Sequence, residues 1–235
     1  ARSLDAVVVP SRSMMDEAVR NGVPPWKIEV IHPFTRKNPD DEYRLPEERS
    51  ILFVGRTDPL KGMPQLLEAL SMIRRGDWKA YIVGGGDRGS GGEGRAGGPE
   101  TGRNITFLGN LPYPELDSWY RRASIAVFPS MCPESFGLVG IEAMSFGRPV
   151  VSFDVGGPRE WLADGETGYL VERGDTRALA SALERLLDDG GLASRMGKAA
   201  MRRVRESFRE EVHVDRLLEL YGRVSGKRAG RTKSH

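Results

Sequence analysis

Short apolar runs rich in Val and Ile alternate along this chain with segments that have the pattern of helices. Strands are expected at residues 50–54, 78–83, 105–108, 125–129, 149–153 and 169–171. Helices are expected between them at residues 64–74, 113–123, 138–146, 158–162 and 176–188. Apolar strands separated by helices indicate a parallel sheet that is covered on both faces. The alternation therefore predicts an α/β fold, with a Rossmann-like doubly wound parallel sheet over residues 50–208.

The segments on either side of this sheet have a different pattern. Residues 1–34 contain a strand at 5–10, a helix that Ser11 begins and Gly22 ends, and a strand at 28–33. Residues 35–49 are polar and contain Pro, so we expect a linker there. Long helices are expected at 191–208 and 209–224, followed by a basic tail at 225–235.

Residues 84–104 contain ten glycines among 21 positions. Because each interior Gly costs about 1 kcal/mol relative to Ala in a helix, we expect a flexible surface loop where a helix would normally cross between two strands. The run of glycines at 84–86 does not form a dinucleotide fingerprint, because no helix follows it and no acidic residue closes the next strand. This absence disfavours an oxidoreductase of the dinucleotide-binding type.

Composition sets several limits on function. The net charge of +2 gives no argument for nucleic acid. From Arg195 onward there are 12 Lys or Arg against 5 Asp or Glu; we favour a solvated helix face and a loose tail over contact with anionic lipid headgroups. Cys132 is the only cysteine, so no intrachain disulfide is expected, which fits a cytoplasmic protein. The three histidines are too dispersed for a metal site, and we expect no metal and no cofactor.

Ligands of doubly wound sheets bind at the carboxyl ends of the strands, where one predicted loop carries two cations. In Gly55–Gly62, Arg56 and Lys61 lie between a strand and a helix. Together with the helix N-terminus they would suit a diphosphate, because Arg can bind two oxygens and Lys supplies a point charge. Basic residues are common in solvated turns, so this motif alone is a weak signal.

Two carboxylates, Glu134 and Glu142, flank the start of another predicted helix eight positions apart. Glu142 lies among apolar residues, where a carboxylate needs a partner such as a ligand hydroxyl. The turn at Phe136, Gly137 and Leu138 leads into the helix, and its backbone N–H groups could bind phosphate or sugar oxygens. The alternative is an exposed helix residue and an ordinary loop carboxylate.

Taken together, these segments resemble the C-terminal half of retaining glycosyltransferases of the GT-B fold. That family includes phosphatidylinositol mannosyltransferases, sucrose and sucrose-phosphate synthases and many lipopolysaccharide glycosyltransferases. The resemblance covers nearly the whole chain, and its most specific element is the E-x7-E spacing of Glu134 and Glu142. In chain order the matching motifs are GRTDPLKG, GGGD, NITFLGNLP, AVFPS, PESFGLVGIEAMSFGRPVV and DVGGPREWLADGETGYLV.

The resemblance implies roles for the matching positions. Arg56 and Lys61 would bind the donor diphosphate and steady the leaving group, with Glu134 facing the donor sugar as the third catalytic residue. Glu142 would bind the ribose. The remaining donor-binding positions implied are Gly55, Asn110, Leu111, Phe136, Gly137 and Leu138.

The implied function is a retaining, metal-independent transfer of a hexose from a UDP- or GDP-linked donor. Residues 1–34 would be a remnant of the N-terminal acceptor domain, and the rest of that domain would bind the acceptor glycan, lipid or small molecule. We therefore expect a fragment that is inactive alone, cytoplasmic or peripheral at the inner membrane face. The competing hypothesis is a non-catalytic nucleotide-sugar binding or assembly module. Sugar, base and acceptor identity stay open.

Overall fold

The main body of this computed structural model is a six-stranded parallel sheet, which confirms the predicted α/β Rossmann-like class. The structure describes residues 4–35, 42–43, 46, 48–85 and 104–231. The strand order is β5-β4-β3-β6-β7-β8. The strands are β3 (Ser50–Val54), β4 (Lys79–Val83), β5 (Ile105–Gly109), β6 (Ile125–Phe128), β7 (Val150–Phe153) and β8 (Gly168–Val171).

Helices cover both faces of this sheet, because successive strand residues point to opposite faces. Ile51 and Phe53 of β3 pack with α2 and α6, whereas Leu52 packs with α3, α4 and the second half of α7. The helices are α2 (Met63–Met72), α3 (Tyr113–Arg122), α4 (Leu138–Ser145), α5 (Pro158–Trp161), α6 (Thr176–Asp188) and α7 (Gly190–Ser207). Asp175 and Asp189 cap the N-termini of α6 and α7 with their side chains.

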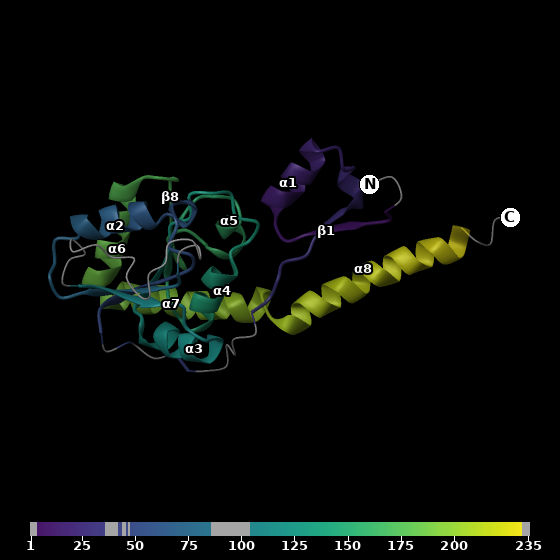
Figure 1. The fold of residues 1–235 in the computed structure, drawn as a ribbon. Helices are drawn as coiled ribbons and strands as arrows, with labels where there is room; N and C mark the ends of the chain where they lie inside the picture. Colours follow the sequence, from purple (N-terminus) through teal and green to yellow (C-terminus); the bar gives the residue numbers. More distant parts are fainter. Residues whose placement is uncertain (1–3, 36–41, 44–45, 47, 86–103, 232–235) are drawn as a thin grey trace.

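The N-terminal segment forms a small unit of its own. It contains the parallel strands β1 (Val7–Val9) and β2 (Ile28–Val30), with α1 (Arg12–Arg20) and the 3-10 turn η1 (Pro25–Lys27) between them. Ser11 caps α1, as the sequence predicts. The last helix, α8 (Glu210–Arg231), runs back along this unit, where Arg223 pairs with Glu29 at 2.9 Å (Figure 1).

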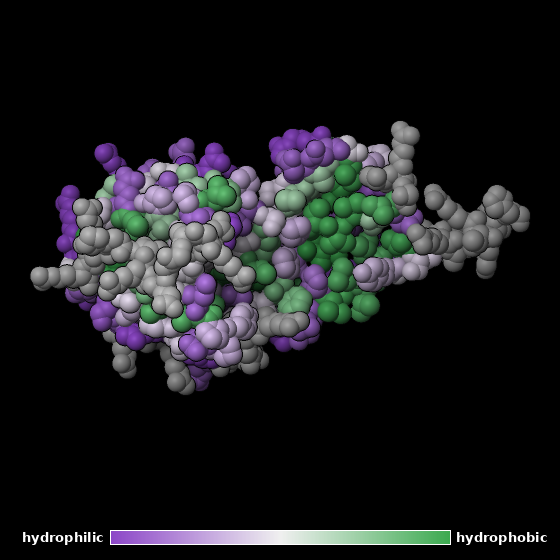
Figure 2. All heavy atoms as spheres, in the orientation of Figure 1, coloured by the Kyte–Doolittle hydropathy of each residue, from purple (hydrophilic) through white to green (hydrophobic). Residues whose placement is uncertain are grey.

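An apolar face is visible on the N-terminal unit and the adjoining part of α8 (Figure 2). In these two segments the exposed large apolar side chains are Leu4, Val8, Val19, Trp26, Val212, Val214, Leu218 and Tyr221.

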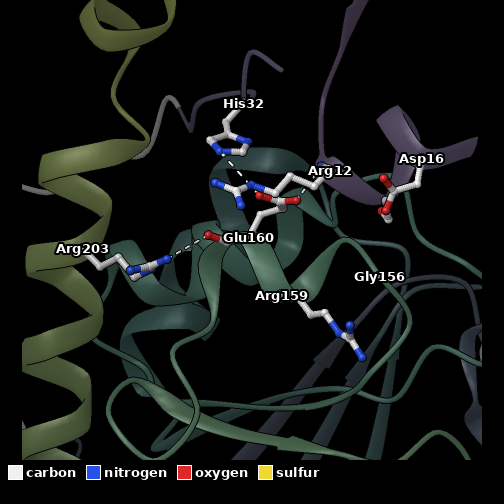
Figure 3. A pocket seen from close by; sticks show the side chains of 8 residues that line it. Arg12, Asp16, His32, Gly156, Arg159, Glu160 and Arg203 are labelled. Atoms are coloured by element: carbon white, nitrogen blue, oxygen red, sulfur yellow. Dashed lines mark hydrogen bonds and ion pairs between the residues drawn. The ribbon is translucent and has the colours of Figure 1, made fainter. Parts of the chain in front are cut away.

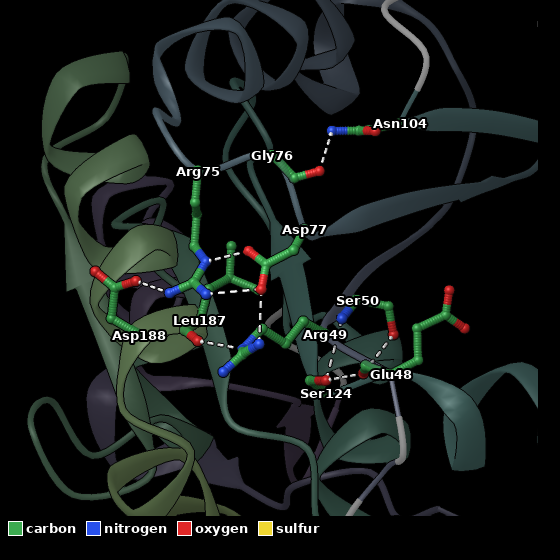
Figure 4. A network of polar contacts seen from close by, with 10 residues as sticks. All are labelled: Glu48, Arg49, Ser50, Arg75, Gly76, Asp77, Asn104, Ser124, Leu187 and Asp188. Carbon is green, nitrogen blue, oxygen red and sulfur yellow. Dashed lines mark hydrogen bonds and ion pairs between the residues drawn. The ribbon is translucent and has the colours of Figure 1, made fainter.

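A group of exposed ion pairs lies at the amino ends of the sheet strands. There Arg75 bridges Asp77 and Asp188, and Arg49 pairs with Asp77 at 2.7 Å (Figure 4).

Glu48 is the centre of the neighbouring polar cluster. It accepts hydrogen bonds from Tyr81 at 2.7 Å and Arg122 at 2.8 Å, and pairs with Lys79 at 2.9 Å. Burial alone would raise the pKa of Glu48, but these three partners lower it to about 2. Charge pairs thus connect the amino ends of the strands, and the candidate site lies at their carboxyl ends.

Several predicted bounds differ from the structure, most of all at the C-terminus. The last helix continues to Arg231, whereas it was predicted to end at Val224 with a tail over 225–235. This extension contains Gly226 and Gly230, each of which costs about 1 kcal/mol and is tolerated in a long helix. Trp78 is buried but precedes β4. The short 3-10 turns, including η2 (Pro59–Lys61), were not predicted. The prediction for 84–104 lies mostly outside the described residues.

Candidate functional site

The loops that follow β3, β4 and β5 are joined by backbone hydrogen bonds. They lie where the carboxyl ends of the parallel strands meet, which we call the carboxyl edge of the sheet. Gly55 N–H donates to Val83 O at 3.0 Å, and Gly84 N–H donates to Gly109 O at 2.7 Å. Thr57 N–H donates to Gly85 O at 3.3 Å. The predicted diphosphate loop and the loop of Asn110 are therefore held close to each other through the end of β4.

Arg56 and Lys61 lie on the loop between β3 and α2, as predicted. The Asp58 side chain caps the η2 turn by accepting from Lys61 N–H at 2.9 Å. Asp58 Oδ2 also lies 3.1 Å from Arg56 Nε, and the Arg56 side chain is 56% exposed. Gly62 then starts α2 with φ +75°, and a Cβ there would lie 1.7 Å from the Pro129 carbonyl oxygen. Glycine is therefore required for the loop to pack against the end of β6.

Lys61 reaches across to Glu134, which lies on the loop between β6 and α4. Lys61 Nζ and Glu134 Oε1 form an ion pair, and their side chains are 26% and 13% exposed. Ser130 Oγ donates to the same carboxylate oxygen at 2.8 Å, and Cys132 Sγ lies 3.9 Å from it. Two residues 73 positions apart, both predicted as catalytic, are thus in direct contact.

The backbone of Glu134 is fixed to the loop that follows β7. Glu134 N–H donates to Val155 O at 3.0 Å, and Gly157 N–H donates to Glu134 O at 2.9 Å. The turn at residues 154–158 therefore supports the loop that carries Glu134.

The turn before α4 is built as the sequence predicts, but the Phe136 side chain serves packing. It is 2% exposed, and its ring centroid lies 5.7 Å from those of His32 and Phe208. Its carbonyl accepts from Trp161 Nε1 at 2.7 Å. Gly137 has φ +92° and precedes the first residue of α4, Leu138, whose side chain is 46% exposed. The Phe136 side chain is therefore not available to a ligand, whereas the backbone of the turn and the Leu138 side chain are not enclosed by this packing.

Glu142 lies on α4 and contacts α3. Tyr120 Oη donates to Glu142 Oε2 at 3.0 Å, and Tyr113 Oη lies 3.4 Å from Oε1. Burial raises the pKa of Tyr120, and the charge of Glu142 raises it further, so this phenol stays a donor. Asn110 is exposed and Leu111 is half-buried on the loop that leads into α3.

The structure thus gathers the predicted residues in two groups of contacts. In one, Asp58 connects Arg56 to Lys61, which pairs with Glu134; in the other, Glu142 contacts Tyr113 and Tyr120 of α3, the helix that the loop of Asn110 leads into. Four residues in these contacts, Ser130, Tyr113, Tyr120 and Asp58, were not predicted from the sequence. Ser130 directly follows the strand that ends in AVFP, and this position is its only signal, whereas Tyr120 sits on the apolar face of a helix and gives none.

No group of three or more His, Cys, Asp or Glu in the part of the chain that the structure describes is arranged to hold a metal ion. Among those same residues, no helix combines the length and apolar character that crossing a membrane requires.

Residues 35–203 match the family described as glycosyl transferases group 1. A D-inositol 3-phosphate glycosyltransferase of Streptomyces avermitilis is 33% identical over 254 aligned positions, covering 98% of this chain and 54% of that protein. A phosphatidyl-myo-inositol mannosyltransferase of Mycobacterium leprae is 37% identical over 180 positions, covering 75% of this chain and 47% of that protein. The chain spans about half the length of these curated relatives.

Solved structures show the same architecture. A sucrose-phosphate synthase from Thermosynechococcus elongatus is 32% identical with a TM-score of 0.79, covering 96% of this chain and 59% of that one. Anabaena HepE in complex with UDP is 20% identical with a TM-score of 0.80, covering 96% of this chain and 65% of that one. The second likeness concerns the fold alone.

Proposed function

The chain belongs to the group 1 glycosyltransferases, and we propose that it is the donor-binding half of a retaining, metal-independent hexosyltransferase that uses a nucleotide-diphosphate sugar. The observation that carries the proposal is the Lys61–Glu134 contact at the carboxyl edge of the sheet, with Arg56 on the same loop as Lys61. The cation suits the diphosphate of such a donor, and the carboxylate suits the hydroxyl groups of its sugar.

In this proposal the cations meet the diphosphate. Arg56 and Lys61 neutralise its oxygens, and they stabilise the charge that develops on the leaving nucleoside diphosphate. Lys61 has to exchange Glu134 for a phosphate oxygen, which releases the carboxylate toward the hydroxyls of the sugar. Glu142, which Tyr113 and Tyr120 hold in place, accepts hydrogen bonds from the ribose hydroxyl groups.

The transfer step proposed for the whole protein is attack from the face that the leaving group occupies. The bond between the anomeric carbon and the diphosphate oxygen breaks, and the acceptor oxygen bonds to that carbon on the same face. The leaving phosphate takes the acceptor's hydroxyl proton, so the atoms balance. The acceptor would be bound between this half and the other part of a longer protein; two of the curated relatives are named for inositol-containing acceptors.

Calorimetry of the chain with UDP, GDP and ADP tests the donor site. We expect UDP or GDP to bind with micromolar to millimolar affinity, and the double variant Arg56→Ala/Lys61→Ala to lose that binding. The matched control is Arg177→Ala/Arg195→Ala, which removes two exposed cations from α6 and α7. Unchanged nucleotide binding by the Arg56/Lys61 double variant would refute the proposal. A full-length protein that binds the nucleotide sugar without turnover would instead support the non-catalytic module.

We also propose that the full-length enzyme is cytoplasmic, with a basic C-terminal end that is solvated; the alternative is contact of this end with anionic headgroups at the inner membrane face. Co-sedimentation with vesicles that is insensitive to anionic lipid would support the solvated end. Sedimentation that rises with the content of anionic lipid would refute it and support the alternative.

A further inference from the structure

A cavity of about 450 Å³ lies between the N-terminal unit and the sheet domain (Figure 3). It is bordered by α1, by the end of β2, by the turn between β7 and α5, and by α7. None of the residues that line this cavity is assigned to the donor site. The volume is well above that of a single water molecule and suits a small organic group.

One face of α1 supplies the first wall. Arg12 and Asp16 are one helical turn apart, and Ser13 lies beside them. Gly156 forms the facing turn with φ +95°, and a Cβ there would lie 3.0 Å from Ser13 Oγ. The close approach of α1 to this turn therefore depends on a glycine.

Glu160 and His32 form the back of the cavity (Figure 3). Glu160 Oε1 accepts from the Arg12 backbone N–H at 2.6 Å, and His32 Nε2 lies 3.6 Å from Glu160 Oε2. His32 Nδ1 donates to Pro10 O at 3.0 Å, because a carbonyl can only accept. The acidic and imidazole groups are thus fixed by the backbone of the N-terminal unit.

Arg203 of α7 supplies the remaining wall. Its Nη2 donates to Glu160 O at 2.9 Å, while its buried Nε has no hydrogen-bond partner among the described residues. A buried donor of this kind costs free energy unless a ligand or water accepts from it. The wall of the cavity thus combines an arginine, whose buried Nε lacks a partner among the described residues, with carboxylates that only accept.

We propose that this cavity binds a polyol or monosaccharide moiety of the acceptor, an inference that rests on the proposed function. Hydroxyl groups both donate and accept, so they match a lining in which Arg12 and Arg203 donate while Asp16 and Glu160 accept. Arg159 also lines the cavity, but its guanidinium is paired with Asp154, which leaves Arg12 and Arg203 against Asp16 and Glu160. A phosphate group is therefore less well matched, because two carboxylates would face it without an excess of cations. An apolar group would offer these side chains no hydrogen-bond partner of its own.

The position of the cavity agrees with an acceptor. Gly156 borders the cavity and pairs with Glu134 in a short parallel bridge. One chain segment thus separates the cavity from the carboxylate proposed to face the donor sugar. A hydroxylated ligand in the cavity would lie against the same loop that positions Glu134.

Saturation-transfer NMR of this chain with myo-inositol, methyl α-glucoside and inorganic phosphate tests the inference. We expect both polyols to bind, and Asp16→Ala and Arg12→Ala each to weaken that binding about tenfold, since each loses a hydrogen bond to a charged group. Glu17→Ala on the same helix is the matched control, because its carboxylate pairs with Arg20 outside the cavity. UDP affinity, measured in parallel by calorimetry, should stay unchanged in all three variants.

Failure of the inference and failure of the proposed function give different results. No polyol binding, polyol binding insensitive to Asp16 and Arg12, or binding of phosphate alone would overturn the inference while UDP binding stands. Polyol binding that depends on Asp16, in a chain that binds no nucleotide, would support the cavity and overturn the donor site.

Discussion

Replacing Glu134 by Gln should make the chain bind UDP more tightly while harming any transfer of sugar. Glu134 holds the Lys61 ammonium in an ion pair whose side chains are 13% and 26% exposed. An exposed pair contributes about 0.2–1 kcal/mol, and breaking a buried one costs about 3–5 kcal/mol. For this half-buried pair we take about 1–2 kcal/mol. Since about 1.4 kcal/mol is tenfold in affinity, UDP should bind roughly five- to thirtyfold more tightly to Glu134→Gln.

Calorimetric titration of UDP into the two proteins measures the effect directly. Glu172→Gln, an exposed carboxylate after β8, is the matched control and should leave the affinity unchanged. In a Lys61→Ala background the gain from Glu134→Gln should disappear, because no ammonium is left to release. Equal or weaker binding of UDP by a folded Glu134→Gln chain would refute the idea that the pair competes with the diphosphate.

Three further predictions concern stability and the ribose site. Gly62→Ala should lower the free energy of unfolding by about 2 kcal/mol more than Gly165→Ala, as measured by urea titration. Both glycines have φ +75°, but only a Cβ at position 62 would collide with Pro129. Equal losses in the two variants would contradict this. Because the folded-state pKa of Glu48 is about 2, its contribution to stability is present at neutral pH and is lost as pH falls from about 4.5 toward 2. Glu48→Gln should therefore flatten that part of the pH dependence of the free energy of unfolding. Glu142→Gln should weaken UDP about tenfold and remove most of its advantage over 2′,3′-dideoxy-UDP; equal losses for both nucleotides would contradict a ribose contact.

Much of the fold could be predicted, because the spacing of apolar residues and the composition of each segment indicate its strands and helices. The run Ser50–Val54 is buried over most of its length, so it must lie in a sheet covered on both faces. The end of α8 was misplaced because Gly226 and the basic residues after it resemble a coil, although α8 continues through them. The spatial order of the strands was not deduced, since it depends on crossovers between distant segments.

The site could be predicted only in part. Arg56, Lys61 and Glu134 follow strands whose carboxyl ends lie at one edge, so their proximity was within reach. The hydrogen bond from Tyr120 to Glu142 was not, because a tyrosine on an apolar helix face looks like any other core residue. The burial of Phe136 depends on His32 and Phe208, which approach it from both ends of the chain.

The charge pairs at the carboxyl edge connect diphosphate binding to the release of a carboxylate. Arg56 and Lys61 already face Asp58 and Glu134, so part of the side-chain entropy that a ligand would cost has been lost before it arrives. The same pairing offsets the Coulomb gain, because each phosphate oxygen replaces a carboxylate rather than water. When Lys61 moves to the diphosphate, Glu134 loses its cation and keeps the Ser130 hydroxyl as a partner. Lys61 and Ser130 both bind Oε1, so the departure of Lys61 opens a position on that oxygen next to the diphosphate, where the donor sugar must begin.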